Sequence, residues 1–420
     1  MFYVTFQYEA VFGLNYSILA ISYMDNKCRI SDIKVLSKDG YNELSGSING
    51  SQIYFRVPEK FDLYPVAECF LGLALLDAMA SNSTIVIDDS VSISKELYDR
   101  IREIQAIYSC WNTDLHIVEL KAKVSAEPIT FYLVGSFFSA GVDSSHTLFR
   151  NKEDISHLIM FRAFDSGNDE ASWQKRVVKQ THFAESIGKI LIPVDTNVKE
   201  WTESRKISWE FVHGLFLSSV GSIFGMKRIY IPSSHTYDEL FPWGSHPLSD
   251  PMWSTESTTV LHDGAGFRRG EKIRDLLTEQ VLADNLQVCW RSTLDNCGEC
   301  SKCVRSMVAT KLLGGKTKSL PDLVGIDELK VLKATDESGA TFLDDAMILA
   351  RESGNKEIYK VLNRYYRRYQ VGLILPLIDR YLFGGFLRSL YRRLFKPDWL
   401  NYRVTLRGSS RLGDCRPHKP

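Results

Sequence analysis

The segment FYLVGSFFSAGVDSSHTLF, residues 131–149, decides the fold class of this chain. An apolar run over 131–138 ends in small, hydroxyl-bearing residues, and an apolar-periodic stretch follows at once. This strand–turn–helix order lets backbone N–H groups approach an anion closely, and the start of the helix adds partial positive charge. Ser139, Ser144 and Ser145 bring hydroxyl donors to the same place. The segment therefore predicts a phosphate-binding loop without the lysine of the GxxxxGK[ST] type.

Asp143 lies inside this predicted loop, and a carboxylate does not suit direct contact with phosphate. Two roles remain open for it from the residues alone. It orients the loop, or it holds Mg²⁺ that bridges phosphate oxygens.

Strand-like and helix-like segments alternate along residues 128–310. Such alternation predicts βαβ units and an α/β fold with a parallel sheet. Ligands of such sheets bind beyond the carboxyl ends of the strands, which is where the predicted loop falls. Strands are predicted at 129–136, 157–164, 189–196 and 228–234, with helices at 169–188 and 209–225 between them.

The N-terminal zone, residues 1–125, predicts an α+β domain without a cluster of catalytic residue types. Its segment 66–80 is apolar nearly all round, which is typical of a buried helix. Residues 94–111 predict an amphipathic helix with Ser94 as its N-cap. We expect a packing or dimerisation role for this zone. Its predicted strands are 3–8, 52–57 and 83–89.

Four of the eight cysteines lie within fifteen residues, in a C-x7-C-x2-C-x2-C spacing that is typical of metal ligands. Four thiolates form a closed tetrahedral shell, which suits structural zinc and leaves no open position for a reactive water. An iron–sulfur cluster is the alternative that spacing leaves open. The predicted metal ligands are Cys289, Cys297, Cys300 and Cys303.

The motif SAGVDSS at 139–145 resembles the SGGxDS loop of the PP-loop ATP pyrophosphatases, which split ATP into AMP and pyrophosphate while adenylating a substrate oxygen. A PP-loop followed by this cysteine spacing resembles 7-cyano-7-deazaguanine synthase and its QueC-like relatives, over about residues 130–310. The resemblance implies a HUP-type (adenine nucleotide alpha hydrolase-like) core that binds ATP, Mg²⁺ and Zn²⁺. It also implies a ligase that activates a small substrate carboxylate for attack by ammonia or an amine.

The resemblance also assigns roles to residues of the loop. It implies Asp143 and Ser144 as catalytic residues. Ala140 departs from the family pattern, which has glycine there; a positive φ would cost alanine about 1 kcal/mol. The ATP-binding residues implied are Ser139, Ala140, Gly141, Val142, Asp143, Ser144, Ser145 and, after the second strand, Asp165.

A long loop at 231–256 is expected on the substrate side, since long loops in compact domains often serve as lids or substrate loops. Basic residues follow it that suit the neutralisation of charge on pyrophosphate. The polar candidates in the loop are His235, Asp238, His246, Asp250 and Glu256, and the basic candidates are Arg268, Arg269 and Lys272.

The C-terminal region, residues 321–420, is predicted to be helical and basic. Residues 361–420 carry 13 Lys/Arg against 3 Asp/Glu, with aromatic residues and arginines interleaved. Such a tail suits an acidic protein, RNA or a membrane surface as partner. The sequence thus predicts three domains: residues 1–125, residues 128–320 and residues 321–420. It leaves open whether the protein forms a homodimer.

The formal net charge of zero excludes a whole-molecule field that recruits nucleic acid. The N-terminus shows no signal-peptide pattern, and no run of 18 apolar residues occurs, so we expect a cytoplasmic protein. Two alternatives to the small-molecule ligase remain. One is a PP-loop enzyme that modifies a nucleobase or a protein, and the other is a non-catalytic nucleotide-binding scaffold.

Overall fold

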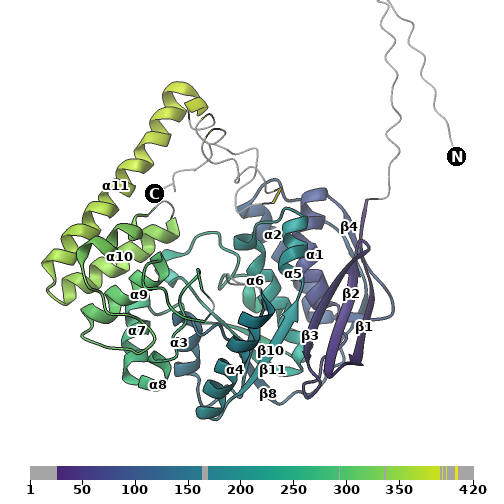
Figure 1. The fold of residues 1–420 in the computed structure, drawn as a ribbon. Helices are drawn as coiled ribbons and strands as arrows, with labels where there is room; N and C mark the ends of the chain where they lie inside the picture. Colours follow the sequence, from purple (N-terminus) through teal and green to yellow (C-terminus); the bar gives the residue numbers. More distant parts are fainter. Residues whose placement is uncertain are drawn as a thin grey trace, which may run out of the picture.

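The computed structural model of the protein describes residues 26–162, 169–292, 294–334, 337–387 and the single positions 390, 394, 403 and 404. It is an α/β fold built on a mostly parallel sheet, as the sequence predicts (Figure 1). The strand predicted at 3–8 lies outside the described residues. The strands are β1 (Lys27–Lys38), β2 (Tyr41–Ile48), β3 (Ser51–Pro58), β4 (Thr84–Ile87), β5 (Ser92–Ser94), β6 (Leu120–Lys121), β7 (Lys123–Ser125), β8 (Leu133–Phe137), β9 (His157–Phe161), β10 (Ile190–Thr196), β11 (Met226–Pro232) and β12 (Thr259–Asp263).

Helices connect the strands and cover the sheet. The helices predicted at 66–80, 94–111, 169–188 and 209–225 are confirmed, with shifts of a few residues at their ends. The helices are α1 (Glu68–Ser81), α2 (Lys95–Trp111), α3 (Val142–Arg150), α4 (Glu170–Ser186), α5 (Val198–Ser204), α6 (Trp209–Val220), α7 (Arg269–Thr278), α8 (Gln280–Ala283), α9 (Ser301–Leu312), α10 (Glu337–Glu352) and α11 (Lys356–Phe383).

The main sheet has ten strands in the order β12-β11-β8-β9-β10-β3-β2-β1-β4-β6. From β12 to β10 all neighbours run parallel, and the chain visits β8, β9 and β10 before it crosses to β11 and β12 on the other side of β8. The strand order therefore reverses at β8. In open α/β sheets this reversal creates a crevice at the carboxyl ends of the strands, where ligands bind.

The parallel strands are apolar on both faces because helices cover both sides of them. In β9, Leu158 and Met160 belong to one hydrophobic cluster, and Ile159 and Phe161 belong to the other. Successive side chains of a strand point to opposite faces, so a continuous apolar run contributes side chains to both clusters. The cluster on one side contains α1, α2 and α6, and the other contains α3, α4 and α7 to α11.

The N-terminal strands join the parallel strands edge to edge. Antiparallel pairing of β3 with β10 places Arg56 opposite Asp195 and Phe55 opposite Thr196. Residues from the N-terminal zone and from the parallel strands consequently share one sheet and one hydrophobic cluster.

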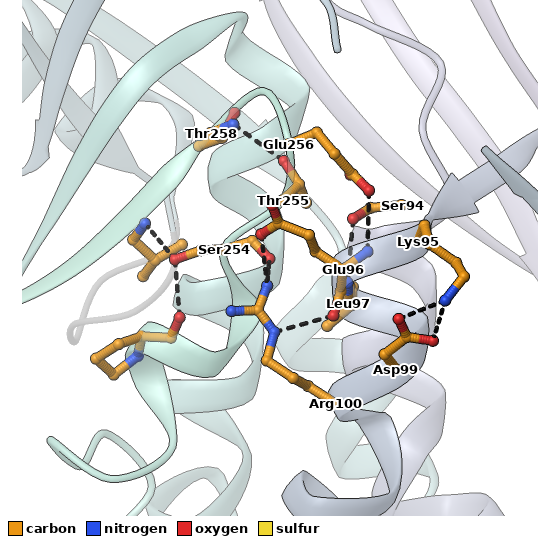
Figure 2. Close-up of polar contacts among 12 residues, drawn as sticks. Ser94, Lys95, Glu96, Leu97, Asp99, Arg100, Ser254, Thr255, Glu256 and Thr258 are labelled. Atoms are coloured by element: carbon orange, nitrogen blue, oxygen red, sulfur yellow. Dashed lines mark hydrogen bonds and ion pairs between the residues drawn. The ribbon is translucent and has the colours of Figure 1, made fainter. Parts of the chain in front are cut away.

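Helix α2 links the N-terminal zone to the turn before β12 (Figure 2). Its N-cap is Ser94, as predicted, whose hydroxyl accepts from Leu97 N at 3.1 Å. Glu256 accepts a hydrogen bond from Glu96 N at 2.9 Å, and the Arg100 guanidinium donates to the carbonyl of Ser254. A carboxylate at a helix N-terminus binds unpaired N–H groups and the positive end of the helix dipole.

Candidate functional site

The predicted phosphate loop connects β8 to α3 at the reversal of strand order. Ala140 has a φ of 59°, in the left-handed region. Alanine is therefore strained at this position, where the PP-loop pattern has glycine. Gly141 is the extended N-cap of α3, and the helix begins at Val142. The first N–H groups of a helix have no intrahelical partner, so this turn offers donors to an anion.

Two serine hydroxyls brace the loop from inside. Ser144 Oγ accepts from Ser139 N at 3.2 Å, lies 3.3 Å from Ser139 Oγ and is 3.2 Å from the carbonyl of Gly141. Gly141 N in turn donates to Ser139 Oγ at 3.3 Å. Ser145, the third predicted hydroxyl, is buried. Ser139 and Ser144 line the cavity described below, whereas Ser145 does not.

Asp143 meets two cations from α7. Lys272 Nζ donates to its Oδ1 at 2.9 Å, and a nitrogen of Arg269 lies 3.5 Å from its Oδ2. Burial raises the pKa of Asp143, but the charges of Lys272 and Arg269 outweigh burial and lower that pKa to about 2. Asp143 is therefore ionised at neutral pH, and two of the three predicted basic residues lie beside it.

The loop opens into a cavity of about 680 Å³, a volume within the range of small-molecule sites. Residues of β8 and β9 line one part of it, and the helices that line the rest are α3, α4, α6, α7, α9 and α10. Among the described residues that line it, basic side chains outnumber acidic ones by three, so the cavity favours an anion. The basic residues are Arg176, Arg269, Lys302, Arg305 and Lys333, and the acidic ones are Asp143 and Glu210.

His235 forms an unusual part of the wall. The side chain is 7% exposed, and its ring lies 4.6, 5.5 and 5.8 Å, between centroids, from Phe241, Trp243 and Phe342. Both ring nitrogens lack a hydrogen-bond partner among the described residues. Burial lowers the pKa of His235 to about 4 despite the nearby charge of Asp143. A neutral imidazole thus offers one donor and one acceptor to a bound molecule.

Two guanidinium groups stack on an aromatic ring of α10 in the cavity wall. The Arg305 guanidinium lies 3.8 Å from the ring centroid of Phe342, and that of Arg269 lies 5.7 Å from it. Arg176 donates to the carbonyl of Ser139 at 3.2 Å and so braces the loop from α4. Arg176 and Phe342 were not predicted, because nothing in their local sequence separates them from ordinary helix residues.

The four predicted cysteines lie together. Their Sγ atoms are all within 4.8 Å of one another, with 3.9 Å between Cys289 and Cys300 and 4.0 Å between Cys297 and Cys303. Tetrahedral zinc with Zn–S bonds of about 2.3 Å needs sulfur–sulfur distances of about 3.8 Å. The four thiols could therefore hold a metal ion such as zinc.

Backbone N–H groups point at the sulfurs, as thiolate ligands require. Arg291 N donates to Cys289 Sγ at 3.3 Å, and Cys300 N donates to Cys297 Sγ at 3.3 Å. Burial raises the pKa of Cys289, but hydrogen bonds from Cys297, Arg291 and other neighbours lower it overall to about 7. Metal ligation uses the thiolate, so such donors favour it.

The cysteine cluster also positions the cavity wall. Cys300 is the N-cap of α9 and accepts from Cys303 N at 3.4 Å. Within the first two turns of α9, Lys302 and Arg305 line the cavity, and Cys289 lines it directly. A metal ion in the cluster would hold the start of α9 and, through it, these two cations.

Other predicted residues lie away from the cavity. Asp238 pairs with Arg268 at 2.6 Å. The buried Asp250 accepts from Ser245 Oγ at 2.6 Å and His246 N at 3.1 Å, so it stabilises its own loop. Glu256 binds the start of α2, as described above. Of the five polar candidates in the 231–256 loop, only His235 lines the cavity. Asp165 lies outside the described residues.

No family model, curated protein or solved structure matches the chain. In the described part of the chain, no helix has both the length and the apolar character needed to cross a membrane.

Proposed function

We propose that the protein is an ATP-dependent adenylating enzyme of the PP-loop type, related to the QueC-like ligases. It activates a substrate carboxylate by splitting ATP into AMP and pyrophosphate. The observation that carries this proposal is the position of the loop at 139–145. This loop lies at the carboxyl end of β8, where the strand order reverses, and opens into a cavity with an excess of basic side chains.

The phosphates of ATP would lie on the loop and the first turn of α3. Gly141 gives the backbone close access, and the hydroxyls of Ser139 and Ser144 flank it. Arg269 and Lys302 line the same cavity and offset the negative charge of the triphosphate. The apolar ends of β9, at Ile159 and Phe161, offer a surface for the adenine ring.

The reaction requires positioning and charge neutralisation rather than a protein nucleophile. A carboxylate oxygen of the substrate attacks the α-phosphorus, the bond from that phosphorus to the oxygen bridging to the β-phosphorus breaks, and pyrophosphate leaves. Ammonia or an amine then attacks the acyl carbon, and AMP departs. Arg269 and Arg305 would stabilise negative charge at these steps, since both guanidinium groups line the cavity.

Mg²⁺ and Zn²⁺ would bind at different places in the protein. Asp143 is ionised and lies at the loop. Each of its carboxylate oxygens has a lone pair left after the bonds to Lys272 and Arg269. Asp143 therefore suits Mg²⁺ that arrives with ATP. Bound Mg²⁺ supplies charge neutralisation on the phosphates. The four cysteines suit Zn²⁺, which would be structural because all four ligand positions are filled.

The test is product analysis with α-labelled ATP, Mg²⁺, ammonium and a fractionated small-molecule extract. Wild-type protein should form AMP and pyrophosphate in equal amounts. Asp143→Asn should lower AMP formation at least about 100-fold, because the acid at the loop is removed. Asp154→Asn is the matched control, since Asp154 is also paired with an arginine, Arg228, but does not line the cavity. Formation of ADP alone, or no ATP binding by calorimetry, would refute the proposal.

A further inference from the structure

Helix α11 changes character along its length. Its first turns are packed into the hydrophobic cluster through Ile358 and Leu362, which are buried. Its last turns extend beyond the neighbouring helices (Figure 1). Between Val371 and Leu394, eleven large apolar side chains of the described residues are at least 42% exposed. An exposed apolar surface of this extent marks an interaction site.

The exposed side chains surround the helix. Leu373, Ile378 and Phe383 are 51%, 45% and 54% exposed and are spaced five residues apart. At about 100° per residue, side chains at this spacing point about 140° apart, so the three lie on three sides of the helix, with gaps of about 140°, 140° and 80° between them. A single partner surface covers one face of a helix. Hydrocarbon covers all faces.

Backbone N–H groups of the turn after α11 are hydrogen-bonded within the turn. Gly384 and Gly385 take positive φ angles of 60° and 84°, and both donate N–H bonds to the carbonyl of Asp379. The Asp379 carboxylate is buried and accepts from Leu387 N at 3.1 Å. Backbone groups inside a membrane must be paired within the protein, and this turn meets that condition.

The charge pattern matches a membrane surface. Arg364, Arg367 and Arg368 precede ten residues, 369–378, that carry no charge. Ten helical residues span about 15 Å, which is about half of the roughly 30 Å hydrocarbon thickness of a bilayer. The arginines would then reach the phosphates of the headgroups. The segment after residue 387 is also basic.

We propose that the exposed apolar side chains of residues 369–387, the membrane-binding segment, insert into one leaflet of a membrane rich in anionic phospholipid. The apolar side chains enter the hydrocarbon, and Arg364, Arg367 and Arg368 bind the headgroups. RNA would engage the arginines but leave the apolar side chains in water. This inference is independent of the proposed adenylating activity.

The experiment is flotation of the full-length protein with vesicles of phosphatidylcholine alone or with about 30 mol% phosphatidylglycerol. We expect flotation with the anionic vesicles, weakened by salt. Combined replacement of Leu373, Ile378 and Phe383 by Ser should weaken binding at least about 100-fold. The matched control replaces three apolar residues of similar or greater exposure elsewhere, Leu36, Ile117 and Val324, by Ser and should leave flotation unchanged.

A third variant, with Arg364, Arg367 and Arg368 replaced by Gln, should lose the preference for anionic vesicles. Circular dichroism and unfolding midpoints of all variants report whether each still folds. Three results would overturn the proposal: absence of flotation by the wild type, flotation that survives the Leu373, Ile378 and Phe383 replacement, or a dimer in light scattering that this replacement dissociates without any vesicle binding.

Discussion

Lys272 donates one hydrogen bond to Asp143 Oδ1 at 2.9 Å and a second to the carbonyl of Ser233 at 2.6 Å. The lysine side chain is 2% exposed and that of Asp143 is 22% exposed. This pair joins α7 to the first turn of α3 and to the end of β11. The acid of the predicted phosphate loop is therefore held by a buried cation that lies 129 residues away in the sequence.

Replacing Lys272 by Met should destabilise the protein by about 3 kcal/mol, because it leaves the Asp143 carboxylate without its nearest cation. Adding Asp143→Asn to this variant should recover part of the loss. Urea unfolding of the two single variants and the double variant measures the coupling. Lys318→Met serves as control, since Lys318 is 90% exposed and should give no measurable change. Additive effects would contradict the coupling.

The buried His235 should make stability depend on pH. Its pKa is about 4 in the folded protein and near 6.5 when unfolded, so the unfolded chain binds the proton first as pH falls. Between pH 6.5 and pH 4 the wild type should therefore lose about 3 kcal/mol more stability than His235→Phe. Urea unfolding at several pH values measures this difference. Parallel pH profiles for the two proteins would show that His235 is accessible to protons when folded.

Ala140 should tolerate glycine but not a branched residue. The left-handed backbone at φ 59° strains any side chain, and Ala140 is fully buried. Ala140→Gly relieves strain but loses a buried methyl group, so its stability should change by less than about 1 kcal/mol. Ala140→Val should destabilise by about 2 kcal/mol or more, since β-branched residues rarely adopt positive φ. Equal stability of the two variants would argue against strain at this position.

Gly214 should be intolerant of a side chain. A Cβ at Gly214 of α6 would lie 1.8 Å from the carbonyl oxygen of Gly244, next to Trp243 of the cavity wall. Gly214→Ala should destabilise by about 2 kcal/mol or more, because the contact is with backbone. Gly266→Ala is the control, since a Cβ there meets nothing within 4 Å. Thermal unfolding compares them; similar melting temperatures would refute this contact.

Loss of one ligand should release the metal from the cysteine cluster. The purified protein should contain about one zinc ion per chain, and Cys303→Ser should lower both that content and the unfolding midpoint. Cys110→Ser is the control, because Cys110 is an exposed thiol outside the cluster. Elemental analysis measures the metal. Detection of iron and sulfide instead would identify the alternative cluster, and unchanged zinc in Cys303→Ser would exclude Cys303 as a ligand.

Local signals in the sequence predicted several features that the structure confirms. The Ser94 cap, the buried helix α1 and the four parallel strands β8 to β11 all follow from side-chain periodicity and capping chemistry within a few residues. The grouping of the four cysteines also follows from their spacing, since ligands a few residues apart can reach one ion. Strands β5, β6 and β7 were missed because they have only two or three residues, and β1, β2 and β12 were missed because they mix polar and apolar residues.

The sequence by itself determined the α/β class, the loop between β8 and α3, and the cysteine spacing, because each depends on contacts between near neighbours in the chain. Only the tertiary structure set the pairing of β3 with β10, the ion pair of Asp143 with Lys272, and the contact of His235 with Phe342. Those contacts join residues far apart in the chain, and burial then sets their charge states. The local sequence around a residue does not indicate which distant side chain will lie about 3 Å from it.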